Sequence, residues 1–237
     1  LIVGKGLTFS YDQRLKSGDA LLLRWSMTAP GGDVIGLSSW SATWLAAIEQ
    51  LPAFRTCVAT RVVQLFGGAG HPGVQVKATR LIDLLARATG AEPVFFPSPA
   101  VLGSAAAAEQ LMKDPAVRRV MMLLPTVTIA LVGIGSLEPS ALLRESGNMT
   151  TAEDAVELGA AGAVGDVCLR FFDADGAPVR SSYDARLVGA DADQIRAIPR
   201  RVAAAGGERK RAAIRGALRG GWVNVLITDV YTARDLL

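Results

Sequence analysis

Short apolar runs alternate with helical patterns along most of the chain. Seven runs have the length and the β-branched content of strands buried on both faces. They cover residues 34–38, 57–66, 93–96, 129–134, 164–172, 201–205 and 223–228. Helical spacing occupies residues 42–51, 73–89, 104–112, 151–159, 191–198, 208–218 and 231–237. The alternation predicts one α/β domain with a mostly parallel sheet.

Local signals support several of these boundaries. Thr150 or Thr151, followed by Glu153 and Asp154, predicts a helix N-cap with an acidic first turn. Residues 173–176 (Asp-Ala-Asp-Gly) follow a strand pattern and predict a hairpin turn. The first 32 residues are punctuated by glycine and proline and have little periodicity. We therefore expect an irregular segment over residues 1–32 and the domain over residues 33–237.

Composition narrows the class of protein. Half of the 237 residues are hydrophobic and the mean hydropathy is +0.31, which indicates a large core or buried subunit contacts. No apolar run reaches the roughly 18 residues of a membrane helix, so we expect a cytoplasmic protein without a membrane partner. Cys57 and Cys168 lie in apolar runs and are expected to be buried, reduced thiols. Because the chain begins mid-pattern and without methionine, we expect it to be part of a longer protein.

Basic residues are concentrated near the C-terminus, although the net charge is only +3. Residues 196–219 contain eight Lys or Arg residues and one acid, Glu208. Two interpretations fit: a nucleic-acid-binding surface, or a solvated helix face with one anion pocket. The second is favoured, because no aromatic residues interleave with the charges. The single histidine and the two separated cysteines argue against a zinc site.

The segment 203–210 (Ala-Ala-Ala-Gly-Gly-Glu-Arg-Lys) predicts an anion-binding site. It is typical of a strand that ends in a glycine turn and continues into a helix. The first N–H groups of a helix are unpaired, and its dipole favours negative charge there. Lys210 in this first turn is electrostatically unfavourable unless an anion lies beside it. The segment therefore predicts a ligand that carries a phosphate or a carboxylate.

Four predicted strand ends are followed by turns of small residues, at 38–43, 67–70, 133–136 and 206–207. In an open parallel sheet, ligands bind at the carboxyl ends of the strands, near the point where the strand order reverses. Small residues there let a ligand approach the backbone closely. Neither the G-x-G-x-x-G fingerprint nor the G-x-x-x-x-G-K-[ST] loop is present, so nucleotide binding is disfavoured and no cofactor is expected.

Individual polar residues have two interpretations each. The hydroxyls within 38–43 could bind a ligand, although one of them is needed as a helix N-cap. Lys77 is either a ligand contact or an exposed helical lysine. Asp166 lies in an apolar run, so its carboxylate is expected to have a partner, which could be sugar hydroxyls or a nearby arginine. Trp40 and Trp44 are expected to pack in the core rather than to stack on a ligand.

Taken in order, these motifs resemble a known family. They are 35–43 (IGLSSWSAT), 62–68 (VVQLFGG), 130–135 (ALVGIG), 162–173 (GAVGDVCLRFFD), 205–210 (AGGERK), 213–221 (AIRGALRGG) and 224–229 (NVLITD). Over residues 33–237 the chain resembles the sugar-binding (effector) domain of SorC/DeoR-type bacterial transcriptional regulators. The resemblance implies a Rossmann-like three-layer sandwich, related to sugar-phosphate isomerases, that is not itself an enzyme. It also implies a phosphorylated sugar as effector, operator DNA bound through an upstream helix-turn-helix absent from this chain, and a homodimer or homotetramer.

The resemblance also implies a set of ligand contacts. The positions that contact the sugar phosphate in the family fall on Ser39, Ser41, Thr43, Gly67, Gly68, Lys77, Asp166 and Lys210. The glycine turns add Gly135 and Gly207. Phe66 stands where relatives that bind doubly phosphorylated sugars often have arginine, which argues against a second phosphate.

Three functions stay open at this point. A ligand sensor is the leading hypothesis. A sugar-phosphate isomerase would use Asp166 as general base, with Lys77 or Lys210 as electrophile. A nucleic-acid-binding module would use the basic residues within 196–219.

Overall fold

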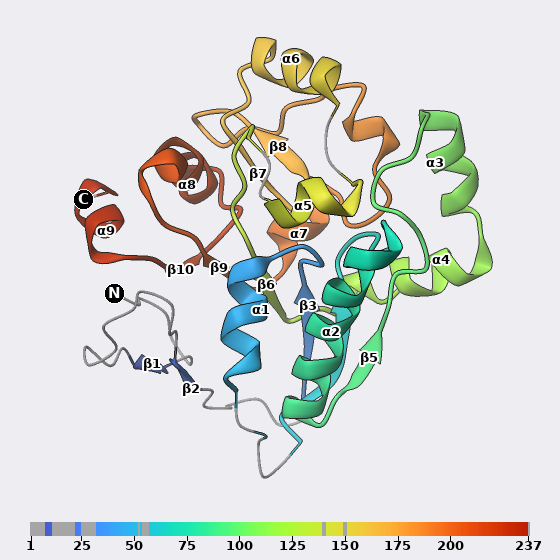
Figure 1. Cartoon of the computed structure of the whole chain (residues 1–237), viewed down its shortest axis with the longest axis vertical. Coiled ribbons are helices and arrows are strands. Elements are labelled where there is room, and N and C mark those ends of the chain that lie inside the picture. The colour runs from blue at the N-terminus through green and yellow to red at the C-terminus, as the bar shows by residue number, and fades with distance from the viewer. Residues whose placement is uncertain are drawn as a thin grey trace.

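Six parallel strands form the central sheet in the part of the chain that the computed structural model describes, namely residues 8–10, 22–24, 32–51, 53, 57–138, 141–148 and 151–236 (Figure 1). They are β3 (Asp33–Leu37), β4 (Ala59–Gln64), β5 (Glu92–Val94), β6 (Ile129–Val132), β9 (Arg200–Ala204) and β10 (Val225–Ile227). Their order across the sheet is β10-β9-β6-β3-β4-β5. If these six strands are numbered in chain order and read across the sheet from β5, the order is the 3-2-1-4-5-6 of a Rossmann fold. The predicted α/β class and mostly parallel sheet are confirmed.

Two hydrophobic cores, one on each face of the sheet, make the fold a three-layer sandwich. On one face, Ile35 and Leu37 of β3 pack with Trp44 of α1 (Ala42–Glu49) and Leu81 of α2 (Pro72–Thr89). On the other face, Val63, Ala130 and Val132 belong to a core with residues of several helices. These helices include α3 (Ala105–Met112), α4 (Pro115–Met121), α7 (Ala192–Ala197) and α8 (Arg211–Arg219). Successive residues of a strand point to opposite faces of the sheet. Because both faces are buried here, every position of a strand is expected to be apolar.

Side-chain caps begin several helices where the sequence predicts them. Ser41 Oγ accepts a hydrogen bond from the Trp44 N–H, at 3.2 Å, at the start of α1. Thr151 and Asp154 form a reciprocal capping box at the start of α6 (Ala152–Ala160). Each cap satisfies an N–H group that would otherwise lack a partner. The predicted cap at Thr151 is confirmed.

The predicted strand over residues 164–172 is wrong, because this segment is a buried hairpin. β7 (Gly165–Val167) pairs antiparallel with β8 (Arg170–Phe172). Cys168 and Leu169 form the tip, with φ angles of +54° and +64°. A two-residue turn with both φ angles positive normally contains glycine or asparagine. Because this tip contains neither, the apolar run has no turn signal. The predicted turn at residues 173–176 is confirmed, since the Gly176 N–H donates to Asp173 O at 2.9 Å.

Several shorter elements complete the described chain. The helices α4, α5 (Ala141–Ser146) and the 3-10 turns η1 (Leu124–Thr126) and η2 (Asp184–Arg186) were not predicted. The helix predicted over residues 208–218 begins as a 3-10 turn, η3 (Glu208–Lys210), and continues as α8. The last helix is α9 (Val230–Leu236). None of the helices within the described ranges combines the length and apolarity needed to span a membrane.

One expectation about the cysteines needs correction, and part of the segment 1–32 lies outside the described residues. Cys57 is exposed rather than buried, because it precedes β4 instead of lying inside it. Cys168 is buried, and both thiols are free. Within residues 1–32, the structure describes an antiparallel pair, β1 (Thr8–Ser10) with β2 (Leu22–Arg24), and Gly32. The rest of the expected irregular segment lies outside the described residues.

Candidate functional site

A cavity of about 150 Å³ opens where the strand order reverses, beyond the carboxyl ends of β3 and β6. Its exposed or half-exposed rim comes from the segments after β3, β6 and β9, with Thr43, Ser136, Leu137, Glu138 and Arg209. Its floor is buried and mostly apolar, with Ser38, Trp40, Phe66, Ile134, Asp166, Cys168, Leu169, Phe171 and Tyr183. A pocket at this point is the usual ligand site of an open α/β sheet.

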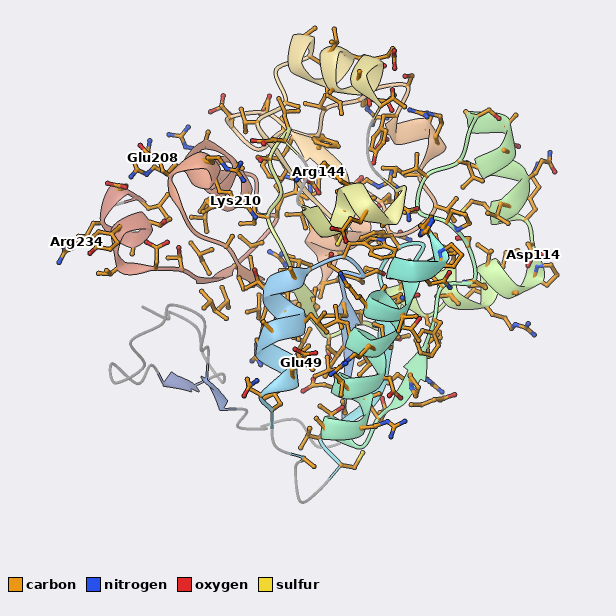
Figure 2. All side chains as sticks on the ribbon, in the orientation of Figure 1. Glu49, Asp114, Arg144, Glu208, Lys210 and Arg234 are labelled. Atoms are coloured by element: carbon orange, nitrogen blue, oxygen red, sulfur yellow. The ribbon has the colours of Figure 1, made fainter. Side chains whose placement is uncertain are left out.

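Lys210 brings a positive charge to the cavity. Figure 2 shows Lys210 on the inner side of the segment that leads into α8, whereas Glu208 lies at the outer edge. The ammonium of Lys210 donates a hydrogen bond to Ile134 O at 2.7 Å. Burial lowers the pKa of Lys210, the charge of Asp166 opposes this shift, and Arg209 adds to it. Within the described ranges no carboxylate forms an ion pair with this ammonium, so its charge is open to an anionic ligand.

Asp166 brings a carboxylate to the same cavity from β7. The side chain is almost completely buried, and its Oδ2 accepts a hydrogen bond from the Leu169 N–H at 2.9 Å. Burial raises the pKa of Asp166 to about 6, although the Leu169 N–H and the charge of Lys210 favour ionisation. At neutral pH the carboxylate is therefore mostly ionised and can accept hydrogen bonds from sugar hydroxyls. Its partner is a backbone N–H rather than the arginine considered as an alternative.

Gly135 lets Asp166 reach the cavity. The Gly135 N–H donates to Asp166 O at 2.9 Å, so the segment after β6 pairs directly with β7. A Cβ atom on Gly135 would lie 1.9 Å from Asp166 Oδ1. Only glycine allows this close approach.

The hydroxyl-rich turn after β3 contributes two of its three predicted contacts. Ser41 and Thr43 line the cavity. Ser41 is also the N-cap of α1, so the helix already uses a hydroxyl that lines the cavity. Ser39 is fully buried and donates to Phe66 O at 3.3 Å. This bond ties the turn to the segment after β4, and Ser39 does not line the cavity.

The structure does not bring Gly67 and Gly68 into the cavity lining. These two glycines allow close packing instead. A Cβ on Gly67 would lie 2.1 Å from Pro99 O, and a Cβ on Gly68 would lie 2.4 Å from Gln64 Nε2. Both positions therefore have a structural reason to be glycine.

Lys77 and Gly207 also lie outside the cavity lining. Lys77 is exposed on α2, with its Nζ 3.5 Å from Glu145 Oε2. The Gly207 N–H already donates to Asp229 Oδ2 at 3.1 Å and to Thr232 Oγ1 at 2.9 Å. A ligand at the glycine turn after β9 would have to compete with these bonds.

The residues that the sequence did not indicate come mainly from the hairpin and the loop after it. Phe171 lies on β8 of the hairpin, which the Gly135–Asp166 bridge joins to the segment after β6, and Tyr183 packs edge-on against Phe171. No local pattern distinguishes them from ordinary core residues. Ser136 is the last residue of the predicted turn at 133–136, and Arg209 lies two residues after the turn at 206–207, so their proximity to these turns could have identified them. Arg209 pairs with Glu138 at 2.9 Å and joins two segments of the rim.

The basic residues within 196–219 are dispersed and partnered by the chain itself. Arg196, Arg211 and Arg219 pair with Asp193, Asp235 and Asp175. The remaining five bond to the chain or have a further interaction: Arg200, Arg201, Arg209, Lys210 and Arg215. This arrangement favours a solvated surface with one anion pocket over a continuous nucleic-acid-binding surface.

The family is established by comparison with known proteins. Residues 13–237 match the family model described as "Putative sugar-binding domain". The chain belongs to this family. It is a sugar-binding domain of the kind found in SorC- and DeoR-type transcriptional regulators, as the resemblance implied.

Two curated relatives are similar over most of this sugar-binding domain. The deoxyribonucleoside regulator of Bacillus subtilis (strain 168) is 35% identical over 210 residues, which cover 89% of this chain and 66% of the relative. The transcriptional regulator LsrR of Klebsiella pneumoniae is 32% identical over 212 residues, which cover 87% of this chain and 62% of the relative. The chain thus spans slightly less than two thirds of the length of these regulators.

Solved structures show the same fold. A domain of a possible sugar-binding transcriptional regulator from Arthrobacter aurescens TC1 has a TM-score of 0.76 and 30% identity, and the match covers 86% of this chain and 78% of that one. The full-length sorbitol operon regulator SorC from Klebsiella pneumoniae has a TM-score of 0.75 and 26% identity, covering 86% of this chain and 66% of that one.

Proposed function

We propose that this domain binds a phosphorylated sugar in the cavity beyond the carboxyl ends of β3 and β6. The observation that carries the proposal is that Lys210 and Asp166, a cation and an anion, both line one small cavity at the switch point of the sheet. A sugar phosphate has the complementary pair of features, a dianionic group and several hydroxyls. The name of one relative, a deoxyribonucleoside regulator, supports a ligand that contains a sugar.

The phosphate is expected at the rim. Arg209 and Thr43 belong to the rim, Lys210 and Ser41 also line the cavity, and all four offer charged or hydroxyl donors. Hydrogen bonds from a charged donor to phosphate contribute about 1.5–3 kcal/mol each. Asp166 on the floor then accepts hydrogen bonds from the sugar. The predicted contacts Ser39, Gly67, Gly68, Lys77 and Gly207 receive less support, because none of them lines the cavity.

At the level of the whole regulator, the proposal is that sugar binding alters operator binding by a DNA-binding segment of a longer protein. A ligand shifts such an equilibrium only by its different affinity for two conformations or assemblies. The relatives are named as transcriptional regulators and are longer than this chain, which supports this role and a cytoplasmic location. A homodimer or homotetramer would match the two-fold symmetry of palindromic operators.

Calorimetric titration of this chain with pentose and hexose monophosphates tests the proposal. Binding by the wild type and a loss of at least tenfold in Lys210→Ala are expected, because one charge-assisted bond to phosphate is removed. Lys113→Ala is the matched control, since Lys113 is exposed and pairs with Glu109. Lys77→Ala is expected to bind as the wild type does. If Lys210→Ala keeps wild-type affinity, Lys210 does not contact the phosphate.

A sugar-phosphate isomerase is the second candidate, because Asp166 with a pKa of about 6 could act as a general base beside Lys210. The regulator names of the relatives favour the sensor. Incubation with aldose and ketose phosphates, followed by product analysis, separates the two functions. Interconversion that disappears in Asp166→Asn would establish the enzyme.

A further inference from the structure

Two side chains that line the cavity floor each carry a buried polar group without a hydrogen-bond partner among the described residues, the Trp40 indole N–H and the Tyr183 hydroxyl. Trp40 is 6% exposed and Tyr183 is 0% exposed. The other buried indoles are satisfied: Trp44 Nε1 donates to Val132 O at 2.7 Å, and Trp222 Nε1 donates to Gly176 O at 2.8 Å. Buried polar groups in native proteins are normally paired, so an unpaired one needs an explanation.

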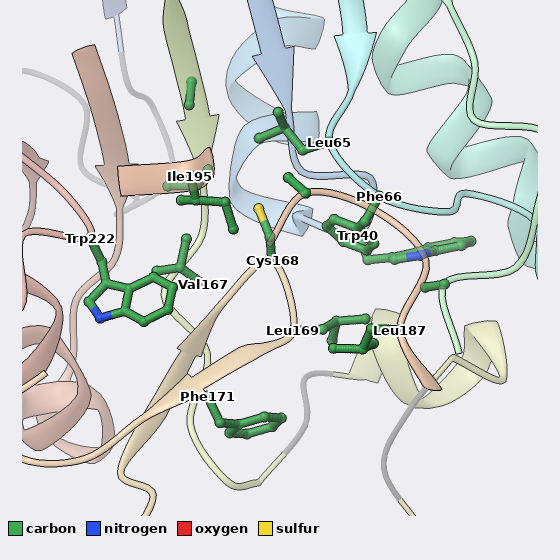
Figure 3. Packing of buried hydrophobic residues seen from close by; sticks show 14 of the residues in the cluster. Trp40, Leu65, Phe66, Val167, Cys168, Leu169, Phe171, Leu187, Ile195 and Trp222 are labelled. Carbon is green, nitrogen blue, oxygen red and sulfur yellow. The ribbon is translucent and has the colours of Figure 1, made fainter. Parts of the chain in front are cut away.

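Both side chains are held firmly in the wall of the cavity. The Tyr183 ring packs edge-on against Phe171, with ring centroids 5.7 Å apart, and the Arg186 guanidinium lies 5.5 Å from its centroid. Figure 3 shows Trp40 beside Phe66, next to the hairpin tip at Cys168 and Leu169. Packing therefore explains where these rings lie, but it does not explain why one is tyrosine rather than phenylalanine.

We propose that the Trp40 N–H and the Tyr183 hydroxyl form hydrogen bonds with oxygen atoms of the bound sugar, at the end of the molecule away from its phosphate. The inference rests on the proposed function and deepens it. The indole can only donate, whereas the phenol can donate or accept. Burial raises the pKa of Tyr183, with smaller contributions from the charges of Asp166 and Asp154, so the hydroxyl stays protonated. With Asp166, the floor offers one donor, one donor–acceptor and one acceptor.

The distribution of charge assigns an orientation and a ligand class. The two cations of the lining, Arg209 and Lys210, follow β9, and Arg209 is exposed at the rim. The floor contributes an anion, Asp166, and neutral aromatic and aliphatic groups. A second phosphate directed inward would meet Asp166 and apolar side chains. The ligand class is therefore a sugar monophosphate that enters with its hydroxyl- or carbonyl-bearing end first.

Conservative substitutions test the hydrogen bonds proposed for Trp40 and Tyr183. Tyr183→Phe and Trp40→Phe keep an aromatic ring and remove the polar group, and Tyr231→Phe, at an exposed site on α9, is the matched control. Each variant is titrated calorimetrically with ribose 5-phosphate, deoxyribose 5-phosphate, glucose 6-phosphate, fructose 6-phosphate and inorganic phosphate. Melting temperatures are measured without ligand.

We expect Tyr183→Phe to weaken binding of the preferred sugar phosphate by about 3- to 10-fold, as for loss of a neutral hydrogen bond. Affinity for inorganic phosphate should not change. The melting temperature without ligand should stay the same or rise, because an unpaired buried hydroxyl is removed. Trp40→Phe should likewise weaken binding of the sugar phosphate and leave phosphate binding unchanged. The loss of affinity in either variant should vanish for a deoxy analogue that lacks the oxygen atom bound by the substituted side chain.

Three results would overturn the inference. Unchanged sugar affinity in both variants would do so while leaving the proposed function intact. A lower melting temperature without ligand in Tyr183→Phe would mean that the hydroxyl holds the fold instead. Failure of the wild type to bind any of the sugar phosphates would reject the proposed function, and the inference with it.

Discussion

Gly135 and Asp166 lie so close together that a single methyl group at position 135 would occupy the place of the carboxylate. The Cβ position of Gly135 is 1.9 Å from Asp166 Oδ1, and the two backbones are joined by a 2.9 Å hydrogen bond. The segment after β6 and the hairpin β7–β8 are thereby locked together on the cavity floor. The position of the acidic group depends on the absence of a side chain on the opposite strand.

Gly135→Ala is expected to displace Asp166 and to weaken sugar-phosphate binding. Overpacking of this kind typically lowers the free energy of unfolding by about 1–3 kcal/mol, which urea denaturation would measure. Gly159→Ala in α6 is the control, since its Cβ would meet no atom within 4 Å. Alanine in a helix should raise stability there by about 0.5–1 kcal/mol. Equal stability of the two variants would contradict the close packing at Gly135.

Asp166→Asn is expected to change the dependence of stability on pH. The pKa of Asp166 is raised by burial from 3.8 to about 6, so the native state binds more protons than the unfolded state in this window. Wild-type stability should therefore fall as pH rises from about 4 to about 6 through ionisation of this group. Asparagine removes that decline, and each pKa unit corresponds to about 1.4 kcal/mol. Urea melts at pH 4 and pH 7 should show a gain for the variant of up to about 3 kcal/mol, at pH 7 only.

The same variant should bind sugar phosphates more weakly, because an amide accepts hydrogen bonds less strongly than a carboxylate. Asp175→Asn, at an exposed hairpin turn, should match the wild type in both stability and binding. A pH profile for Asp166→Asn that parallels the wild type would show that Asp166 is already ionised at pH 4.

Asp154 and Arg186 form an ion pair that fastens α6 to the loop carrying Tyr183. Asp154 is buried, and it also caps α6 through Thr151. Removing one partner of a buried pair leaves the other uncompensated, so Asp154→Ala should lower the free energy of unfolding by about 3 kcal/mol. Asp193→Ala, which breaks an exposed pair with Arg196, should cost much less. Similar losses in both variants would argue against a buried pair.

The Asp154 contribution should also depend on pH. Burial acts to raise the pKa of Asp154, but the Thr151 N–H and Arg186 together outweigh it and hold the pKa below its ordinary value of 3.8. The stabilisation is therefore present above about pH 4 and is lost as pH falls through the lower, native-state pKa. Denaturation of the wild type and Asp154→Ala across pH 2–7 should show the difference shrinking at the acidic end.

The two cysteines should differ in reactivity. Cys57 is exposed, whereas Cys168 is buried, and burial together with the charge of Asp166 raises the pKa of its thiol. A thiolate is the reactive form, so an aromatic disulfide reagent should titrate one thiol in the native protein and two in urea. Cys57→Ser should abolish the native reaction. Rapid reaction of Cys168 in that variant would contradict the buried hairpin tip.

Much of the fold can be predicted because its signals are local. Six of the seven expected strands overlap the strands of the sheet, and glycine turns and caps mark their ends. The hairpin at residues 165–172 was missed because Cys168 and Leu169 adopt positive φ angles without a residue that signals them. Burial imposes this turn, and the Leu169 N–H bond to Asp166 supports it.

The site was predictable in part. Asp166 was identified because a carboxylate within an apolar run needs a partner. Lys210 was identified because a cation at the start of a helix needs an anion beside it. Lys77 carries the same kind of charge, yet it lies outside the cavity and pairs with Glu145. Sequence spacing alone does not show which side of α2 faces the carboxyl ends of β3 and β6.

The sequence by itself determined the six strands of the central sheet, most of the helices and two charged residues of the cavity, because periodicity, capping and glycine act over a few neighbouring residues. Only the tertiary structure decided which turns meet, since that depends on the order of strands across the sheet. It placed Tyr183, from a loop far along the chain, in the same cavity wall as Trp40, and it closed the glycine turn after β9 with Asp229. Contacts between such distant segments arise from packing and register, which leave no local pattern.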